Sequence, residues 1–473
     1  MQRDEVLATA RAGTDPRSRL SATGASARRF GPLKQLLDYL CRALLFALAL
    51  APAPKELAAA PAAPPAVLPA ASAEARAVFA HAKDKLLQLR VIHKATQART
   101  STGTGFLASP DGLVLTNYHV VAKLALEPGS YALELERTDG SSATPRLVAI
   151  DVANDLAVLS TDLRGQRYLP IQPTPLTKGE RGFSMGHPLD LGLTIVEGTY
   201  NGFVETEFAR RIHYTGAINS GMSGGPAVTL EGKVFGVNVA RRWGDQLVSY
   251  LVPSEHAAVL LKRAAAQGTV PVDLRAEVTA QLLAQQERLY AQLLAAPMHT
   301  TTMGRFAVPD AKVSFVRCWG APDETPARLY DRDIRICISN SDVFVGDRLQ
   351  TGQLQFIHSR YEARELGAVR FAALIESAYA TGPYSFETQA NKKELTEFRC
   401  HDDFVTRPAG TLRVALCSRA YKSFAGLYDF HLRALTVDSS SSALLSTLTL
   451  SGVSFETGRR FAQQYLEAIS WTN

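Results

Sequence analysis

Apolar and polar residues alternate over short distances between residues 103 and 253. The segments Gly105–Ala108, Leu113–Thr116, Leu156–Leu159 and Val234–Val239 are examples, and Gly, Pro and Asp residues separate segments of this kind. Alternation with a period of two is typical of half-buried strands, and repeated short strands indicate a sandwich or barrel. We therefore predict a mainly β domain in this part of the chain.

Two helix-like segments follow this domain. Ser254 and Asp273 are suited to cap helices over residues 255–267 and 274–296. The second segment carries its apolar residues on one stripe, so we predict that it docks as a connector rather than forming an oligomerisation coil. From about residue 300 the pattern returns to strand-like segments, which predicts a C-terminal α+β domain.

The N-terminal region has the layout of a secretory signal. Residues 1–42 contain eight Lys/Arg and four Asp/Glu, the run Ala43–Ala51 is apolar, and an Ala-rich stretch follows. A membrane-spanning helix needs about 20 apolar residues, so export through a signal peptide is predicted, with an uncleaved anchor as the alternative. Residues 52–72 form a Pro/Ala linker, and apolar residues at helical spacing between 75 and 90 predict a helix leading into the first strand.

The charge distribution argues against nucleic-acid binding. Residues 1–42 account for +4 of the formal net charge of +6, which leaves +2 for the rest of the chain. The remaining basic residues are scattered rather than clustered. The basic pI therefore does not indicate a nucleic-acid partner.

Four of the five cysteines lie in the last third of the chain. Cys41 falls in the presumed signal, and after export the other four allow three connectivities. Each close pair flanks two adjacent strand-like segments, which favours Cys318–Cys337 and Cys400–Cys417 as hairpin-type disulfides. A zinc site is the alternative, disfavoured because no pair has C-x2-C spacing. We predict neither a metal nor a cofactor.

Other features of the C-terminal region are architectural. The stretch His401-Asp402-Asp403 beside Cys400 suggests a metal or acid/base site, but no further ligands are visible and a solvated turn is the favoured interpretation. An amphipathic helix is predicted near residues 457–470. Binding of substrate, cell envelope or a partner is the expected role of this domain.

Three segments carry residues suited to nucleophilic catalysis, in the chain order His, Asp, Ser. The first is Leu115-Thr-Asn-Tyr-His119, a buried-looking strand whose end presents an imidazole at the lip of a barrel. An imidazole suits a general base that takes a hydroxyl proton and later returns it to a leaving amine. Alone, such a histidine is more often structural.

The second segment is Asn154-Asp155-Leu-Ala-Val-Leu, in which a carboxylate directly precedes an apolar strand. A partly buried carboxylate can accept the imidazole N–H, fix its tautomer and stabilise the imidazolium. Asp151 is the rival for this role, but it does not immediately precede the strand.

The third segment is Gly221-Met-Ser223-Gly-Gly-Pro226. A serine hydroxyl needs an adjacent base to act as a nucleophile. The flanking glycines permit a tight turn with positive φ, in which the backbone N–H groups of Gly221 and Ser223 are the predicted oxyanion donors. The conjunction of these three segments in one strand-rich domain predicts a catalytic site.

Around these residues the chain resembles the chymotrypsin-like serine peptidases, specifically the bacterial high-temperature-requirement (HtrA/Deg) group. The resemblance covers about a third of the chain and implies two six-stranded antiparallel barrels. It implies His119 as general base, Asp155 as its orienting partner and Ser223 as nucleophile. The segments that carry it are G-x-G-F, L-T-N-x-H-V-V, N-D-L-A-V-L, S-M-G-H-P, A-I-N-S-G-M-S-G-G-P and S-Y-L-V-P-S.

The chain also departs from this family. Met222 stands where the family usually has Asn, and His187 where it often has Asn. Neither is expected to carry the chemistry. No PDZ domain is recognisable after residue 300, so the family's regulation and oligomerisation are not transferred. No Ile-Val-Gly-Gly-like start follows a basic residue, which predicts that there is no zymogen step.

The resemblance also implies a primary pocket without a carboxylate, which argues against cleavage after Lys or Arg. Its apolar lining suggests a small or medium apolar substrate side chain. The residues implied as substrate-binding are Ala217, Val237, Asn238, Val239, Ser249, Tyr250 and Leu251.

These observations predict an exported bacterial serine endopeptidase, periplasmic or secreted, that forms an acyl-enzyme with protein or peptide substrates. The alternative is a non-catalytic binding or scaffold protein that acts through its C-terminal domain. The predicted divisions are a signal region and the start of the linker (1–60), a linker (61–75), a trypsin-like protease domain (76–265), a helical connector (266–299) and a disulfide-containing α+β domain (300–473).

Overall fold

The structure is a computed structural model, and it describes residues 72–172, 175–241, 248–267, 273–323, 328–381 and 392–472. The predicted signal region, and the linker up to residue 71, lie outside the described residues. Within the described ranges, every helix is too short or too polar to cross a membrane.

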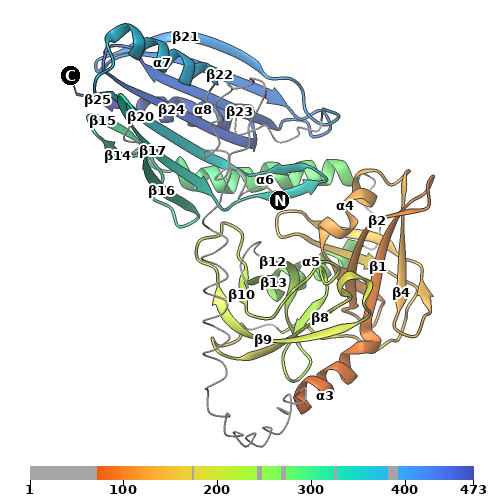
Figure 1. The fold of residues 1–473 in the computed structure, drawn as a ribbon. Helices are drawn as coiled ribbons and strands as arrows, with labels where there is room; N and C mark the ends of the chain where they lie inside the picture. The colour runs from red at the N-terminus through yellow and green to blue at the C-terminus, as the bar shows by residue number, and fades with distance from the viewer. Residues whose placement is uncertain are drawn as a thin grey trace, which may run out of the picture. The chain divides into compact units, whose positions relative to one another are not determined.

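Two antiparallel sheets form the protease-like region (Figure 1). The first has seven strands in the order β5-β4-β1-β2-β3-β7-β6, and the second is a closed barrel in the order β10-β13-β12-β11-β8-β9. The strands of the first sheet are β1 (Leu86–His93), β2 (Ala98–Leu107), β3 (Leu113–Thr116), β4 (Tyr131–Arg137), β5 (Ser142–Ala143), β6 (Arg146–Asp151) and β7 (Leu156–Ser160). Those of the barrel are β8 (Arg181–Gly186), β9 (Thr194–Phe203), β10 (Ile212–Tyr214), β11 (Pro226–Val228), β12 (Val234–Arg241) and β13 (Ser249–Pro253).

This region confirms the predicted mainly β, chymotrypsin-like fold and corrects its details. The closed barrel has the implied six strands, but the first sheet has seven strands and is not closed. The predicted helix at 75–90 ends at Ala82, as α3 (Ala73–Ala82), because Leu86 and Leu89 pair with β2 inside strand β1. Tertiary pairing therefore overrides the helical spacing of these leucines.

Helices α5 (Ser254–Gln267) and α6 (Leu274–Leu293) occupy the two segments predicted to be helical. Asp273 caps α6 as expected, since its side chain accepts the backbone N–H groups of Arg275 and Ala276. Ser254 does not precede α5 but belongs to it, and its hydroxyl donates to the carbonyl of Gln172 at 2.8 Å.

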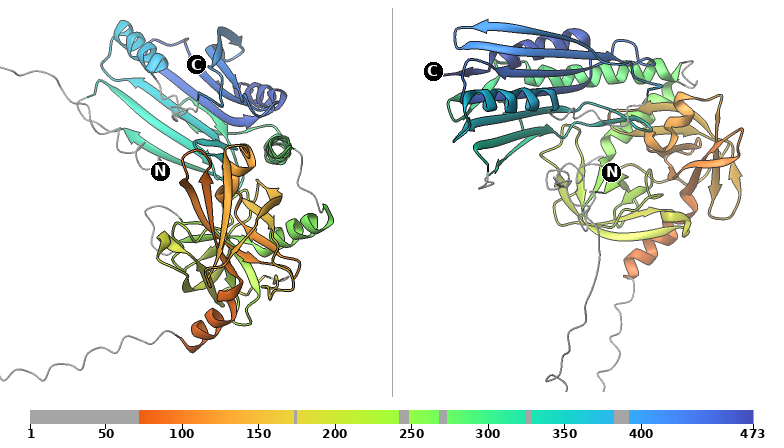
Figure 2. Two further views of the ribbon diagram at one scale, coloured as in Figure 1. Left: turned by 90° about the vertical axis from the view of Figure 1, so that its right-hand side faces the viewer. Right: turned by 45° about the horizontal axis from the view of Figure 1, so that its top comes forward.

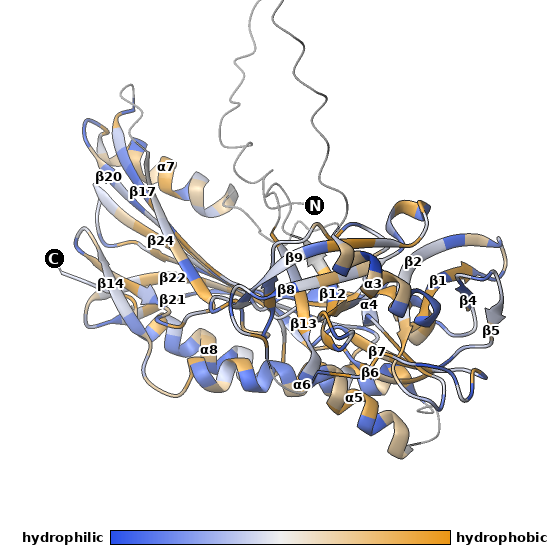
Figure 3. Cartoon of the chain, turned by 90° about the horizontal axis from the view of Figure 1, so that it is seen from below, coloured by the Kyte–Doolittle hydropathy of each residue, from blue (hydrophilic) through white to orange (hydrophobic). Residues whose placement is uncertain are grey.

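The C-terminal region is built on a second seven-stranded antiparallel sheet, in the order β16-β17-β20-β24-β23-β22-β21. Apolar and polar residues alternate along its strands (Figure 3). Helices α7 (Ala368–Thr381) and α8 (Phe455–Glu467) lie on opposite faces of this sheet (Figure 2). The strands are β16 (Val316–Asp323), β17 (Tyr330–Ser339), β20 (Leu354–Ala363), β21 (Arg399–Arg407), β22 (Gly410–Ala420), β23 (Tyr428–Thr436) and β24 (Ser442–Val453).

Two small sheets complete this region. One contains β14 (His299–Met303), β15 (Phe306–Asp310) and β25 (Ser470–Trp471). The other is the hairpin of β18 (Val343–Gly346) and β19 (Leu349–Thr351). The predicted terminal helix near 457–470 is α8, whereas α7 was not predicted.

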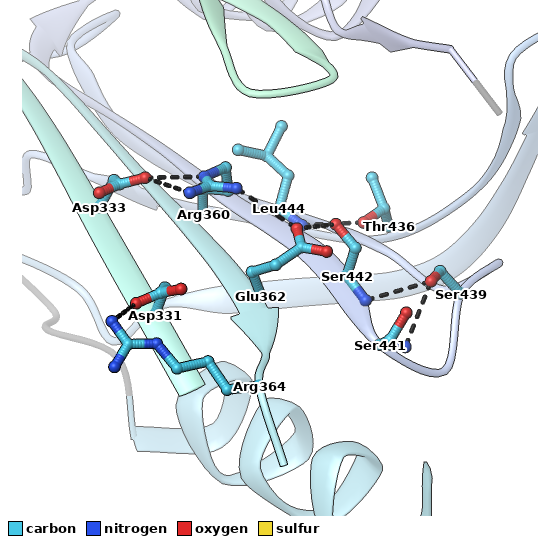
Figure 4. Close-up of polar contacts among 10 residues, drawn as sticks. All are labelled: Asp331, Asp333, Arg360, Glu362, Arg364, Thr436, Ser439, Ser441, Ser442 and Leu444. Atoms are coloured by element: carbon cyan, nitrogen blue, oxygen red, sulfur yellow. Dashed lines mark hydrogen bonds and ion pairs between the residues drawn. The ribbon is translucent and has the colours of Figure 1, made fainter. Parts of the chain in front are cut away.

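A row of polar side chains crosses strands β17, β20 and β24 (Figure 4). The Nε atom of Arg360 donates to Asp333 at 2.7 Å, and its Nη1 atom lies 3.3 Å from Glu362. The hydroxyl of Ser442 in turn donates to Glu362 at 2.9 Å. Because each partner lies on a neighbouring strand or two residues along, the row follows the strand register directly. Partly exposed pairs of this kind contribute about 1 kcal/mol or less each.

The cysteines pair as predicted from their spacing. The Sγ atoms of Cys318 and Cys337 lie 2.07 Å apart, and those of Cys400 and Cys417 lie 2.00 Å apart. In both cases the two residues stand directly opposite each other on adjacent antiparallel strands. The stretch after Cys400 is not the solvated turn that was expected, because His401, Asp402 and Asp403 belong to the regular strand β21.

Helix α6 contributes to two hydrophobic cores. Val278 and Leu282, in its N-terminal half, pack in a cluster with residues of α4 (Tyr118–Leu126). Leu289 and Tyr290, in its C-terminal half, belong to the cluster beneath the C-terminal sheet. This packing agrees with the docked connector predicted from the sequence.

Candidate active site

His119 lies at the start of α4, a helix that directly follows strand β3. The first N–H groups of a helix lack partners within the helix. One carboxylate oxygen of Asp155 accepts the backbone N–H of His119 at 2.8 Å, and the other lies 2.7 Å from Nδ1 of its imidazole. An ionised carboxylate only accepts hydrogen bonds, so Nδ1 is the donor and Nε2 keeps its lone pair.

Asp155 lies on a turn whose backbone is fixed by a hydrogen bond. It adopts a φ of 62°, an uncommon conformation for a residue with a side chain, and its carbonyl accepts Nδ2 of Asn117 at 2.8 Å. Asp151, the rival carboxylate, instead accepts the backbone N–H of Asn154 at 3.0 Å and its side-chain amide at 2.8 Å. The structure therefore brings Asp155, and not Asp151, to the imidazole.

The pKa of His119 reflects two opposing effects. Burial disfavours the charged imidazolium and acts to lower the pKa, whereas the charge of Asp155 and its hydrogen bond act to raise it. The second effect is the larger, so the pKa of His119 lies above the ordinary histidine value. The side chain is 28% exposed, so the ring is accessible from the surface.

Ser223 lies on the turn before β11, and this turn packs against the strands that lead to His119. The carbonyl of Ser223 accepts the N–H of Thr104 at 2.8 Å. Gly224 follows with a φ of +82°, and a Cβ atom at this position would lie 2.3 Å from Thr104 O and 2.9 Å from Asn117 N. Only glycine fits here, which explains the Ser-Gly sequence of the turn.

The backbone of the turn is oriented by hydrogen bonds to its carbonyl groups. The carbonyls of Ser220, Gly221, Met222 and Ser223 accept, in that order, from Leu189 N, Thr104 Oγ1, Gly225 N and Thr104 N. In a planar trans peptide, the carbonyl and the following N–H point in opposite directions. The N–H groups of Gly221 and Ser223 therefore point to the other side, and no residue in the described ranges accepts a hydrogen bond from either.

This arrangement depends on Thr104. Its hydroxyl donates to Gly221 O at 2.7 Å and accepts the backbone N–H of His187 at 3.0 Å. Burial lowers the pKa of His187 to about 4, so its ring is neutral at physiological pH. His187 therefore lies behind the turn as a neutral packing residue.

A second support comes from the segment after β8. Leu189 and Asp190 have φ values of 50° and 58°, and Leu189 N donates to Ser220 O at 3.0 Å. The carboxylate of Asp190 accepts Nε2 of Gln88 at 2.8 Å and forms an ion pair with Arg99. The uncommon backbone of this segment thereby fixes the Ser220–Gly221 peptide.

The hydroxyl of Ser223 has no hydrogen-bond partner among the described residues. In proteases without substrate, the hydrogen bond from nucleophile to base is often long and tightens only when substrate binds. The site thus contains an oriented imidazole, an unpartnered serine hydroxyl and two unpartnered N–H groups.

The residues predicted to bind substrate lie close together but differ in orientation. Strands β12 and β13 pair with each other, and Ser249 Oγ accepts Ile218 N at 3.3 Å, next to the exposed Ala217. Val239 and Tyr250 are half-buried. Ala217, Val239 and Tyr250 are compatible with a pocket wall, whereas Ser249 is buried.

The side chains of the other three do not face a pocket, which leaves only their backbone for contact with a substrate. Val237 and Leu251 are fully buried in barrel cores, because successive strand residues face opposite sides. Asn238 is also buried, and its amide donates to the carbonyls of Met185 and Met222. It supports the serine turn from inside rather than facing a pocket.

Among the described residues, one group has the ligand types and proximity of a metal site: Asp310, Cys318 and Cys337. Its sulfur atoms are bonded to each other as a disulfide. A disulfide offers no thiolate, which is the sulfur species that binds zinc. The group therefore does not fit a zinc site.

Sequence reasoning did not identify Thr104 and Leu189 as part of the site. Thr104 lies between the two glycines of the G-x-G-F segment, and Leu189 follows the S-M-G-H-P segment. Both act through hydrogen bonds with Ser220 or Gly221. No local pattern marks such long-range partners.

A double antiparallel β domain with this arrangement of His, Asp, Ser and free N–H groups defines the class of chymotrypsin-like serine peptidases. Residues 103–237 match the family model described as trypsin-like peptidase domain. This part of the chain is therefore similar to trypsin-like peptidase domains.

The chain is also similar to curated serine proteases. The chain is 33% identical over 165 residues to the putative serine protease HhoB of Synechocystis sp., covering 33% of this chain and 38% of the relative. It is 31% identical over 193 residues to a probable periplasmic serine endoprotease DegP-like of Hahella chejuensis, covering 37% and 38% of the two chains. Among solved structures, the serine endoprotease from Yersinia pestis is 22% identical, with a TM-score of 0.37, over 42% of this chain and 69% of that one. The chain thus spans little more than a third of the length of the curated relatives.

Proposed function

We propose that the protein is an exported serine endopeptidase that hydrolyses peptide bonds through an acyl-enzyme intermediate. In this proposal His119 Nε2 takes the proton of Ser223 Oγ as the oxygen attacks the scissile carbonyl. Asp155 fixes the tautomer and stabilises the imidazolium. The imidazolium then returns the proton to the leaving amine, and a water molecule repeats the sequence to release the acyl group.

The observation that carries the proposal is the orientation of the serine turn. Four carbonyl groups are bonded away from the site, so the N–H groups of Gly221 and Ser223 are available together. Donors fixed in advance stabilise a developing oxyanion without reorganisation, and losing one typically costs about 100- to 1000-fold in kcat. A protein that used this domain only as a scaffold would not need two unsatisfied donors beside an unpartnered serine.

The export part of the proposal rests on the N-terminal sequence pattern and on relatives named as periplasmic. The substrates are proposed to be proteins or peptides with a small or medium apolar side chain at the primary position. Cell fractionation with an antibody against residues 300–473 tests the location, and recovery of the protein in the cytoplasm alone would contradict it.

Labelling with a small alkyl fluorophosphonate tests the catalytic part. We expect the full chain to be labelled, Ser223→Ala to lose all labelling, and Ser220→Ala to keep it, since that hydroxyl lies on the same turn without a role in the chemistry. If the folded wild type is not labelled, the non-catalytic binding alternative takes the place of this proposal.

A further inference from the structure

The hairpin β18–β19 of the C-terminal region lies against the helix that carries His119. The ring of Phe344 is 6.0 Å from the imidazole of His119, centroid to centroid, at an interplanar angle of 75°. The same ring is 6.4 Å from Tyr118, at 67°. Both contacts are edge-to-face, the arrangement that aromatic pairs favour. A residue far along the chain therefore borders the imidazole of the proposed base.

The hairpin is fixed in this position by a shared hydrophobic core. Val343, Val345 and Leu349 are buried in one cluster with the apolar side of α4. The hydroxyl of Tyr118 donates to the carbonyl of Val345 at 2.9 Å in a buried environment. Burial raises the pKa of Tyr118, so the phenol remains a donor. At the rim, Lys123 and Asp347 form an ion pair at 2.9 Å.

The strand residues of the hairpin face alternately inward and outward. Val343 and Val345 are buried, whereas Phe344 between them is only half-buried. Phe344 thus keeps part of its apolar surface accessible beside His119, while its neighbours prevent it from moving away. An apolar side chain that is both anchored and partly exposed next to a catalytic group is suited to contact a substrate.

The segment before the hairpin contacts the second barrel. Phe208, in the loop between β9 and β10, donates its N–H to the carbonyl of Asn340 at 2.9 Å. The side chain of Asn340 donates to the carbonyl of Thr206 at 3.0 Å, and Phe208 packs edge-to-face on Phe315 at 5.1 Å. Residues 340–344 therefore connect a loop of the closed barrel to the imidazole at the start of α4.

We propose that the β18–β19 hairpin is part of the substrate-binding cleft, and that Phe344 forms an apolar wall for the substrate side chain next to His119. The ligand is a peptide with an aliphatic or aromatic residue at that position. This inference rests on the proposed function, because it assigns a subsite to the same catalytic centre. It gives the C-terminal region a direct part in substrate selection.

Internally quenched peptides test the proposal. They carry Leu or Gly either at the second position before the scissile bond or at the first position after it. We expect the wild type to prefer Leu at one of these positions, and Phe344→Ala to lose about tenfold of that preference in kcat/KM, the effect of one apolar contact. The change is expected mainly in KM, because a wall contacts ground state and transition state alike.

Two further variants make the result specific. Phe344→Trp narrows the space and is expected to shift the preference toward Gly, while Phe344→Leu restores most of the wild-type preference. Phe404→Ala is the matched control, since this phenylalanine of the same region is 61% exposed on β21. It is expected to leave both peptide preferences unchanged.

Labelling by the alkyl fluorophosphonate distinguishes a failure of the proposed catalytic function from a failure of the proposed subsite. Absence of Ser223-dependent labelling in the wild type contradicts the proposed function itself. If Phe344→Ala is folded, is labelled at the wild-type rate and keeps the wild-type preference at both positions, the subsite proposal is wrong. It is also wrong if the variant is folded but labelled much more slowly, because Phe344 would then act on the base.

Discussion

The two regions of the molecule place histidines in contrasting surroundings. In the protease domain, His119 is in contact with a carboxylate, remains partly exposed, and has a raised pKa. In the C-terminal region, His358 is fully buried between Ser446 Oγ at 2.8 Å and the carbonyl of Pro309 at 3.0 Å. Burial there lowers the pKa to about 4. The carboxylate thus raises the pKa of one ring, whereas burial keeps the other ring neutral.

The same contrast extends to the backbone and to charged groups. The serine turn leaves two N–H groups unpartnered, and Asp155 and Leu189 adopt uncommon positive φ values. In the C-terminal sheet, Arg419 and Asp429 are buried as a 2.7 Å ion pair, with Tyr421 Oη donating to the same carboxylate at 2.7 Å. Backbone strain and unpartnered donors thus occur beside the proposed chemistry, whereas the carboxylate of this buried pair is bonded to both an arginine and a tyrosine.

The largest expected effect comes from removing the charge beside His119. Asp155→Asn is expected to lower kcat by about 10⁴-fold, because an amide cannot hold the imidazole in the required tautomer. Asn tolerates positive φ, so the fold should be kept. The measurement is kcat on a cleaved peptide, together with the melting temperature.

Asp151→Asn is the matched control for this prediction. Its carboxylate binds Asn154 and does not reach the imidazole. We expect this variant to keep most of the wild-type kcat. Equal losses in the two variants would show that the pairing with Asp155 has no special role.

On the other side of the comparison, Arg419→Met should destabilise the fold without acting on the site. It leaves the carboxylate of Asp429 buried without its cation, which costs about 3 to 5 kcal/mol of unfolding free energy. Burial raises the pKa of Asp429. The loss should therefore shrink as the pH falls, since protonation removes the buried charge. Chemical denaturation at two pH values measures both effects.

Arg459→Met provides the control for an exposed pair. Arg459 contacts Glu456 at 2.8 Å on α8, with both side chains more than half exposed. Loss of this pair should cost about 0.5 kcal/mol or less. A similar cost for the two arginines would mean that burial does not set the value of the Arg419–Asp429 pair.

A smaller effect is expected from Thr104, which acts through the serine turn. Thr104→Val removes the hydroxyl that holds the Gly221 carbonyl, so the oxyanion donors lose their fixed orientation. We expect kcat to fall by up to about 100-fold, with little change in KM. Thr104→Ser keeps the hydroxyl and should restore activity.

Thr102→Val tests the same substitution two residues earlier on β2, where the side chain is half-buried. It should leave kcat close to that of the wild type. A loss of activity in Thr104→Val that Thr104→Ser does not rescue would indicate a packing defect rather than a role in positioning.

The sequence predicted the protease domain well because its information is local. The pattern of short alternating segments predicted the β architecture, and the segments around His119 and Asp155 predicted two residues that are in contact in the structure. The spacing of the cysteines predicted both pairs, since each pair joins adjacent strands. Helix α7 was not predicted, and the start of strand β1 was predicted to be helical. Tertiary packing decides between competing local patterns in these segments.

Other parts of the site depend on contacts that no local pattern records. Val237 and Leu251 were placed in the pocket by analogy, but the strand alternation turns their side chains into the barrel cores. Thr104 binds Gly221 across more than a hundred residues, and Phe344 reaches His119 across still more. Such partners are defined by the fold as a whole.

The finest test of the comparison between the two histidines is the pH dependence of activity. Only neutral His119 can take the serine proton, so kcat/KM should fall as the pH drops through the pKa of this ring. The pKa is raised above the ordinary histidine value in the folded protein. The acid limb of the pH profile, where kcat/KM falls, should therefore lie at higher pH than for an ordinary histidine. His358, with a pKa of about 4, is neutral throughout this range and does not contribute.

Two variants test whether protonation of His119 causes the loss of activity at acid pH. His401→Gln changes a histidine that is exposed on β21 and should leave the limb in place. In Asp155→Asn the stabilising charge is gone while the burial remains, so the limb of the residual activity should move to lower pH. If the wild-type limb lies at or below the ordinary histidine value, the carboxylate does not outweigh burial at His119, and the two histidines differ in exposure alone.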